Sequence, residues 1–117
     1  MAELSAGMQY LKLCKIIHGD IKGVSTLGNL RVVRTNLQTQ TNILIDDSGR
    51  VRISDYGLAV YDSDTESSSG HFNGGTIRWM SPERLNPETR SVKATFSSDV
   101  YSFAMVIYEV SEQFFLP

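Results

Sequence analysis

The stretch NILIDDSGRVRISDYGLA, residues 42–59, contains the pattern that decides the fold. Two short apolar runs, at 42–45 and Val51–Ile53, flank the polar sequence Asp-Asp-Ser-Gly at 46–49. Short apolar runs separated by turn-forming residues predict two strands joined as a hairpin. The sequence Asp-Tyr-Gly at 55–57 follows the second strand directly, so a carboxylate is expected in a tight loop at the end of this hairpin.

A helix is predicted on the N-terminal side of the hairpin. Residues Ala2–Leu13 carry Leu4, Met8 and Leu11 at positions i, i+4 and i+7, which form one face of an amphipathic helix. The short apolar sequence Ile16-Ile17 then leads into a loop.

A second long helix is predicted near the C-terminus. Residues 97–99, Ser-Ser-Asp, are typical of a helix N-terminus, and the following sequence VYSFAMVIYEV is apolar on nearly every side, so this helix requires burial all round. Between hairpin and helix, a long polar loop is expected over 55–75, and Pro82 with Glu83 opens a short helix. The expected fold class is α+β, mainly α, with a short β-hairpin.

Composition narrows the classes of partner and compartment. The chain has 117 residues, enough for one small domain, and a formal charge of −2, which argues against nucleic acid as a partner. Its longest strongly apolar stretch, 103–110, is too short for a membrane span, and the N-terminus lacks the features of a signal peptide. Cys14 is the only cysteine, so we expect a reducing compartment and a cytoplasmic location.

Three short motifs carry residues suited to phosphoryl transfer: HGDIKG at 18–23, DYG at 55–57 and SPE at 81–83. Such a site needs a carboxylate to orient and deprotonate a hydroxyl, a cation beside the transferred phosphate, and oxygen ligands for Mg²⁺. Asp20 and Lys22 suit the first two tasks, and Asn42 with Asp55 suits the third. We expect tight loops to present all four at one edge, with Gly57 permitting the turn after Asp55.

These motifs resemble those of protein kinases, whose signature runs H-R-D-L-K-x-x-N, D-F-G and A-P-E. The sequences GGTIRWMSPERL at 74–85 and SDVYSFAMVIYEV at 98–110 are similar to the end of the kinase activation segment and to the buried central helix. The resemblance implies that residues 1–117 are a partial C-terminal lobe of a protein-kinase-like fold. GTIRWMSPE points to the tyrosine-kinase-like group, and Lys22, two positions after Asp20, is the serine/threonine form.

The resemblance also implies roles for individual residues. Asp20 would be the catalytic base, Lys22 would contact the transferred phosphate of ATP, and Asn42 and Asp55 would hold Mg²⁺. Further roles, in the stacked spine, the activation segment and the support of the catalytic loop, fall to His18, Tyr56, Gly57, Thr76, Ser81, Pro82, Glu83 and Asp99.

Two further features bear on regulation. Ser63, Thr65 and the serines at 67–69 are candidate phosphorylation sites in the long loop. Gly19 stands where the family commonly has an arginine that binds an activation-segment phosphate, so we expect this segment not to be ordered through that contact.

Residues 24–40 interrupt the resemblance. Without them, Asn42 would follow Asp20 by five positions, which is the kinase spacing. One hypothesis is the translation of an unspliced intron, because Val24-Ser25 can be encoded by the splice-donor sequence GTGAGT and Gln40 by the acceptor triplet CAG. The alternative is a genuine insertion that bulges from the active site and leaves Asn42 in place.

Several functions stay open from the sequence. The chain begins at the helix before the catalytic loop, without a Gly-rich loop or V-A-I-K lysine, so we expect it to be inactive alone and active with a protein substrate only in an intact domain. The alternatives are an inactive, pseudokinase-like docking module and, with less support, a phosphatase or nuclease that uses Asp20 and Asp55 as a metal pair. The long C-terminal helix would expose an apolar surface prone to association.

Overall fold

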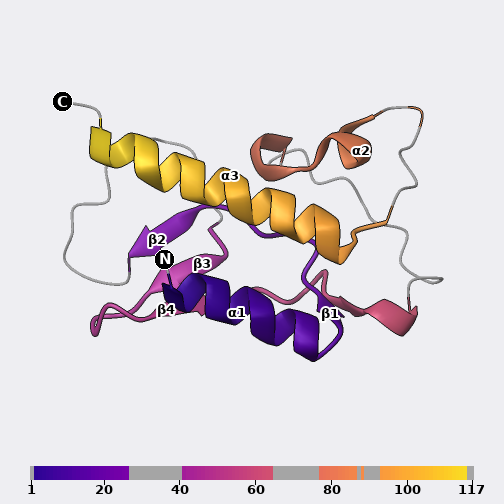
Figure 1. Ribbon diagram of the computed structural model, residues 1–117, viewed down its shortest axis with the longest axis horizontal. Helices are drawn as coiled ribbons and strands as arrows, with labels where there is room; N and C mark the ends of the chain where they lie inside the picture. Colours follow the sequence, from indigo (N-terminus) through magenta and orange to yellow (C-terminus); the bar gives the residue numbers. More distant parts are fainter. Residues whose placement is uncertain (1, 27–40, 65–76, 87, 89–92, 116–117) are drawn as a thin grey trace.

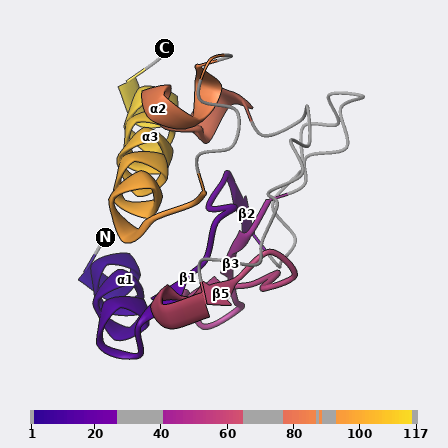
Figure 2. The same ribbon diagram turned by 90° about the vertical axis from the view of Figure 1, so that its right-hand side faces the viewer.

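A computed structural model describes residues 2–26, 41–64, 77–86, 88 and 93–115 of the chain. The long helix α3 (Phe96–Phe115) crosses the molecule, with α2 (Pro82–Leu85) against one side and α1 (Ala2–Leu13) and the short strands on the other (Figures 1 and 2). The loop at 18–23 runs between α3 and the strands (Figure 1). The predicted class, α+β with few strands, is confirmed.

The helix α1 forms because its apolar residues recur at helical spacing, as the sequence predicted. Leu4, Met8 and Leu11 are buried along one face of α1 and form half of the buried core cluster. They pack with Ile21 and Val106, which come from the catalytic loop and from α3, so α1 is held to both. The other side chains of this cluster and those packed against it, from the strands, η2 (Ile77–Trp79) and α3, are Ile43, Ile16, Val51, Ile53, Trp79, Phe96 and Phe103.

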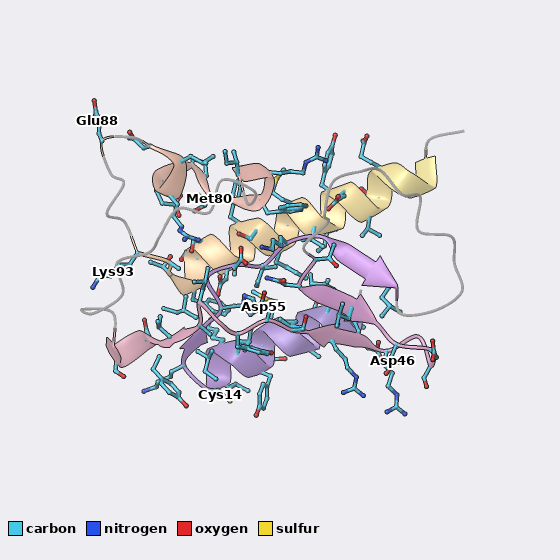
Figure 3. All side chains as sticks on the ribbon, turned by 180° about the vertical axis from the view of Figure 1, so that it is seen from behind. Cys14, Asp46, Asp55, Met80, Glu88 and Lys93 are labelled. Carbon is cyan, nitrogen blue, oxygen red and sulfur yellow. The ribbon has the colours of Figure 1, made fainter. Side chains whose placement is uncertain are left out.

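The predicted hairpin is present as β3 (Ile43–Ile45) and β4 (Val51–Ile53), which pair antiparallel with Ile43 opposite Ile53. Asp46 closes its turn: Oδ1 accepts hydrogen bonds from the backbone N–H groups of Ser48, at 3.0 Å, and Arg50, at 2.9 Å. These bonds, that of Arg50 first, hold the pKa of the Asp46 carboxyl below its usual value. Asp46 lies at the tip of the hairpin and Asp55 near the centre of the molecule (Figure 3).

A third strand, β2 (Val24–Thr26), extends this sheet in parallel to β3, with Val24 opposite Ile43. The sequence pattern gave no sign of it, because three residues are too few to show a period. The backbone N–H of Asn42 donates to the carbonyl of Lys22 at 2.9 Å, so the chain leaves and re-enters the sheet at adjacent points. Gly23, with φ +48°, sits so close to Thr41 that a Cβ on Gly23 would lie 2.7 Å from Thr41 Cγ2.

The prediction of a loop over 55–75 is wrong for part of the described residues. Val60–Tyr61 form strand β5, which pairs antiparallel with β1 (Ile16–Ile17), and a 3₁₀ helix, η1, follows at Asp62–Asp64. Tyr61 pairs with Ile16 and Val60 with Ile17. Strands of two residues carry no periodicity and arise here from pairing between distant segments. Ser63 lies in η1, whereas Thr65 and the serines at 67–69 lie outside the described residues.

The helix α3 begins one residue earlier than predicted, at Phe96. Thr95 and Ser98 bond reciprocally: the N–H of Ser98 donates to Thr95 Oγ1 at 3.1 Å, and the N–H of Thr95 donates to Ser98 Oγ at 2.9 Å. This is the arrangement of a capping box, and it satisfies backbone donors that the first helical turn leaves unpaired. No helix in the described part of the chain combines the length and the hydropathy that a membrane span requires.

The expected burial of this helix on every side is not met. Ser98, Asp99, Ser102 and Val106 face the interior, and among the α3 side chains that the structure describes, Val100, Tyr101 and Tyr108 are exposed hydrophobic ones. The buried face of α3 is therefore rich in polar groups near its N-terminus, where the helix meets the catalytic loop.

Candidate active site

The loop between β1 and β2 carries the first group of predicted site residues, and it is buried. His18, Asp20 and Lys22 are 0%, 9% and 4% exposed, which is unusual for groups of this polarity. Ile21, between the two charged residues, points into the apolar core and anchors the loop. Alternation along the loop thus places Asp20 and Lys22 together on the side away from the core.

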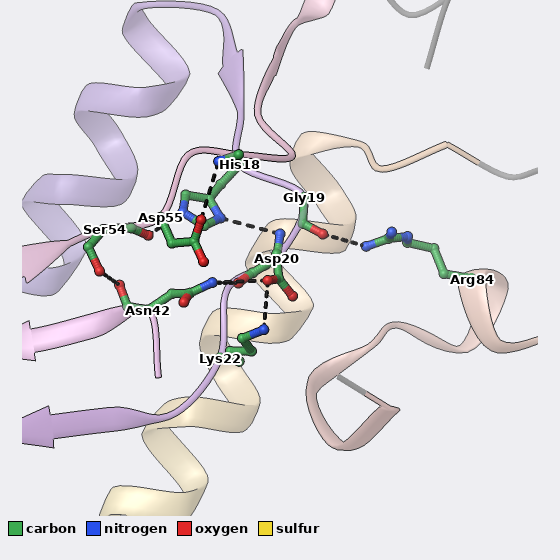
Figure 4. A network of polar contacts seen from close by, with 9 residues as sticks. His18, Gly19, Asp20, Lys22, Asn42, Ser54, Asp55 and Arg84 are labelled. Atoms are coloured by element: carbon green, nitrogen blue, oxygen red, sulfur yellow. Dashed lines mark hydrogen bonds and ion pairs between the residues drawn. The ribbon is translucent and has the colours of Figure 1, made fainter. Parts of the chain in front are cut away.

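Asp20, Lys22 and Asn42 converge on one oxygen atom (Figure 4). Asp20 Oδ2 accepts a hydrogen bond from Lys22 Nζ at 2.7 Å and another from Asn42 Nδ2 at 3.0 Å. The same amide nitrogen also donates to the backbone carbonyl of Asp20 at 2.7 Å. Two donors on one oxygen fix the carboxylate plane, and the ion pair compensates for the burial of both charges.

Asn42 is held from its backbone as well. Its carbonyl accepts from the N–H of Ser54 at 2.8 Å and from Ser54 Oγ at 3.3 Å. Because both acceptors of its side-chain amide are oxygens, the nitrogen must face Asp20, and the amide oxygen remains as the atom able to ligate a cation. The intervening residues 24–40 thus do not keep Asn42 from the predicted position beside Asp20.

Asp55 follows Ser54 and precedes Tyr56, whose ring packs edge-on against His18 with centroids 5.1 Å apart. Asp55 therefore lies between Ser54, which bonds to Asn42, and Tyr56, which packs against His18. The predicted cause of the turn is wrong: the left-handed residue is Asp55, with φ +60°, which aspartate tolerates better than most residues do. Gly57 serves a different purpose, because a Cβ there would lie 3.3 Å from Asp55 Oδ1.

Asp99 reaches the catalytic loop from the first turn of α3. Oδ2 accepts from the N–H of His18 at 2.7 Å, and Oδ1 accepts from the N–H of Gly19 at 2.9 Å. Burial raises the pKa of the Asp99 carboxyl above its usual value, while these two N–H groups and the positive charge of Arg84 act in the opposite direction. The carboxylate thus bridges two successive peptide groups directly before Asp20.

The imidazole of His18 is oriented by two contacts. Nε2 donates to the carbonyl of Ser54 at 2.9 Å, and Nδ1 accepts a longer bond of 3.3 Å from the N–H of Asp20. Together they require the tautomer that carries its proton on Nε2. His18 therefore connects the loop that carries Asp20 with the loop that carries Asp55.

The predicted activation-segment residues lie partly within and partly outside the described part of the chain. Thr76 is outside it. Ser81, Pro82 and Glu83 form the start of α2, with Pro82 at the first helical position. The Ser81 hydroxyl is buried and finds no hydrogen-bond partner within the described ranges.

This buried hydroxyl leads to a prediction about stability. Replacing Ser81 by alanine should raise the free energy of unfolding by about 1 kcal/mol, because an unpaired hydroxyl in the interior loses its hydration without compensation. Urea denaturation of the variant and of the control Ser48→Ala, an exposed turn position, measures the difference. A destabilised Ser81→Ala variant with an unchanged control would contradict it.

The oxygen atoms of Asn42 and Asp55 suit a hard divalent cation. One amide oxygen and one carboxylate are too few to enclose such an ion, and the described residues contain no group of three or more His, Cys, Asp or Glu side chains that would hold one. Mg²⁺ commonly binds one or two protein ligands and completes its octahedron with water and phosphate oxygens. The donor set therefore fits a cation that is shared with a phosphorylated substrate.

Comparison with known proteins identifies the family to which this sequence belongs. The family profile of the protein tyrosine and serine/threonine kinases matches residues 1–115. The chain belongs to this family. It is 32% identical over 111 residues to the serine/threonine/tyrosine-protein kinase HT1 of Arabidopsis thaliana, which covers 93% of this chain and 22% of that protein.

Two other kinases show the same relation. The receptor-interacting serine/threonine-protein kinase 2 of Bos taurus is 36% identical over 102 residues, covering 82% of this chain and 18% of the relative. The dual specificity protein kinase pyk3 of Dictyostelium discoideum is 36% identical over 100 residues, covering 86% and 7%. The chain spans at most 22% of the length of these relatives. Kinases in general use ATP and a divalent metal ion.

Two residues that contact the predicted site have no role in the sequence-based prediction. Ser54 bonds both Asn42 and His18, and its position one residue before the DYG motif was a usable signal. Arg84 donates from Nη1 to the carbonyl of Gly19 at 3.0 Å across 65 positions of sequence. No local pattern marks such a contact.

Proposed function

We propose that this kinase segment supplies the catalytic and metal-binding loops for ATP-dependent phosphoryl transfer to protein serine and threonine hydroxyls. The observation that carries the proposal is the Asp20 carboxylate, whose Oδ2 is fixed by Lys22 at 2.7 Å and by Asn42 at 3.0 Å. With two donors on Oδ2, the other oxygen, Oδ1, would be the one to accept from an incoming hydroxyl. A fixed carboxylate of this kind is what a general base for an alcohol requires.

The residues divide the reaction between them. As the acceptor oxygen bonds to the γ-phosphorus of ATP and the bond from that phosphorus to the β–γ bridging oxygen breaks, Asp20 takes the hydroxyl proton. Lys22 places a positive charge beside the transferred group. Asn42 and Asp55 would hold the Mg²⁺ that neutralises charge on the phosphates when it is bound.

Serine and threonine specificity rests on Lys22, whose position two residues after Asp20 is the serine/threonine form of the loop. The relatives bear names of serine/threonine, tyrosine and dual specificity kinases, so the acceptor must be measured. In the longer protein that contains this chain, transfer from labelled ATP to peptides with a single Ser, Thr or Tyr acceptor tests the proposal. Transfer to Ser and Thr peptides is expected, and transfer confined to Tyr peptides would refute the specificity.

We further propose that the 117-residue chain is not sufficient for catalysis and acts in the cytoplasm. The relatives extend far beyond the matched stretch, and the sequence contains neither a Gly-rich phosphate loop nor a V-A-I-K lysine. Titration of Mg-ATP into the chain, followed by calorimetry, should give no heat of binding. Measurable binding would overturn the expectation of inactivity and leave the family membership untouched.

A non-catalytic docking role is the second candidate. Val100, Tyr101 and Tyr108 place exposed apolar side chains on α3. Such a surface favours association with other proteins or with a second copy of the chain. Sedimentation of the chain over a range of concentrations, with Tyr108→Ser as the comparison, separates a self-associating chain from a monomer.

Residues 24–40 are proposed to be an insertion in the catalytic loop, whether encoded as such or translated from an unspliced intron. The hydrogen bond from Asn42 N–H to the Lys22 carbonyl, at 2.9 Å, and the approach of Gly23 to Thr41 support this, because the two ends of the segment already lie next to each other. Transcript sequencing separates the two origins: a uniform mRNA that retains these codons excludes the intron.

Deleting residues 24–40 should therefore leave the fold intact. Closing a loop of this length costs about 2 kcal/mol of chain entropy, which the deletion removes, against the loss of the short β2–β3 pairing. We expect the deleted chain to be at least as stable as the intact one, measured by urea denaturation. As a control, deleting residues 46–49 removes the turn of the β3–β4 hairpin and should destabilise the protein. Unfolding by the first deletion would show that the segment is an integral part of the domain.

A further inference from the structure

Gly19, directly before Asp20, is held by hydrogen bonds at both its N–H and its carbonyl, and Figure 4 shows the one at the carbonyl. On its N-terminal side, the N–H of Gly19 donates to Asp99 Oδ1 at 2.9 Å. On its C-terminal side, the carbonyl of Gly19 accepts from Arg84 Nη1 at 3.0 Å. The Asp99 carboxylate comes from α3 and the Arg84 guanidinium from α2, so two helices bind the same residue of the loop that carries Asp20.

Gly19 cannot provide this support itself. Its φ of +79° is a conformation that other residues adopt only with strain, and a Cβ at this position would lie 3.3 Å from the carbonyl oxygen of Leu58 and 3.4 Å from Ala94 Cβ. The Gly19 carbonyl receives its hydrogen bond from Arg84, in another element of the fold. Arg84 supplies it with a charged donor, and a hydrogen bond from a charged group is stronger than one between neutral groups.

The Arg84 guanidinium also acts on Asp99, the other residue that binds Gly19. Its charge favours the ionised form of Asp99 and opposes the effect of burial on that carboxyl. Arg84 thus stabilises the anion that binds the N–H groups of His18 and Gly19, in addition to binding the Gly19 carbonyl directly. Both effects fix the peptide that joins Gly19 to Asp20.

We propose that Arg84 is a positioning residue that couples the helix α2 to the orientation of Asp20, an inference that rests on the proposed role of Asp20 as the base. When α2 is seated, the Gly19 carbonyl is bound and Asp20 is held toward Lys22 and Asn42. When α2 is displaced, the Gly19 carbonyl loses its hydrogen bond from Arg84. The segment that ends in SPE at 81–83 would thereby control the catalytic base from outside the reacting atoms.

The test begins with the hydrogen bond itself. In the ¹³C,¹⁵N-labelled protein, the carbonyl ¹³C resonance of Gly19 reports its hydrogen bond from Arg84, and the exchange rate of its amide proton reports its hydrogen bond to Asp99. Neither measurement requires catalysis. Arg84→Met should move the carbonyl resonance upfield and speed amide exchange about tenfold, whereas Arg84→Lys, which keeps a charged donor, should restore part of both. The exposed Arg50→Met serves as the matched control and should change neither.

Activity supplies the second arm, in the longer protein that contains this chain. Arg84→Met should lower kcat about tenfold with the KM for ATP unchanged, because misplacement of the base affects the chemical step and not nucleotide binding. An unshifted Gly19 carbonyl in Arg84→Met would refute the contact, and a shifted carbonyl with unchanged kcat would refute the positioning role. If Asp20→Asn leaves kcat unchanged while Arg84→Met shifts the Gly19 carbonyl as expected, the proposed function of Asp20 is refuted and the contact of Arg84 with Gly19 is not.

Discussion

Replacing Asp20 by asparagine should lower kcat for phosphoryl transfer by about 10²- to 10⁴-fold in the kinase domain that contains this chain. Asparagine keeps the size of the side chain and an oxygen to face Lys22, but it cannot take the proton of the attacking hydroxyl. The KM for ATP should stay within about twofold, because Asp20 is proposed to contact the acceptor and not the nucleotide. Steady-state kinetics with a serine peptide give both constants.

Stability must be separated from chemistry in this variant. Lys22 is 4% exposed and its ammonium pairs with Asp20 at 2.7 Å, so the asparagine leaves a buried cation without its anion. A loss of about 3 kcal/mol in unfolding free energy is expected for this reason. The double variant Asp20→Asn, Lys22→Met should recover most of that stability and none of the activity. Recovery of activity along with stability would contradict the role of Asp20 as a base.

The second large effect is expected at Asp99. Replacing Asp99 by alanine should lower the unfolding free energy by about 3 kcal/mol, because two buried backbone N–H groups, those of His18 and Gly19, lose the carboxylate that accepts their hydrogen bonds. Replacing it by asparagine should have an intermediate effect. His18 and Gly19 donate to different oxygens of Asp99, so in asparagine the amide oxygen keeps one of these N–H groups and the amide nitrogen faces the other.

Urea denaturation of the three proteins ranks these effects. The exposed Asp47→Ala serves as the control and should stay within about 0.5 kcal/mol of the parent. Equal stability of Asp99→Asn and the parent would mean that relief from burying the charge, the cause that raises the pKa of Asp99, outweighs the lost hydrogen bond. Amide exchange at His18 and Gly19 should rise in both variants, whatever the change in global stability.

The elements that could be predicted from the sequence are those whose own residues specify them. The α1 helix shows Leu4, Met8 and Leu11 on one face, and the β3–β4 hairpin carries turn residues between its two apolar runs. The strands β1, β2 and β5 could not be predicted, because two or three residues carry no period and their pairing partners are distant in the chain. Tertiary contacts decide such strands.

The candidate site shows the same division. The residue types at Asp20, Lys22, Asn42 and Asp55 indicated phosphoryl transfer, and the first three meet in space. The turn after the hairpin was attributed to Gly57, whereas the left-handed backbone is at Asp55, since a motif gives residue types and not dihedral angles. Arg84 was missed because its contact depends on how α2 is seated.

The bonds of Asp99 have a consequence for the order in which the molecule assembles. The β3–β4 hairpin joins neighbouring residues and can form within about 1–10 μs, whereas the contact of Asp99 with His18 closes 81 positions of chain. Contacts of such long range are late and slow, because the chain between them must first lose its freedom. We therefore expect the loop that carries Asp20 to acquire its final conformation only when α3 docks, and to lose it first when α3 detaches.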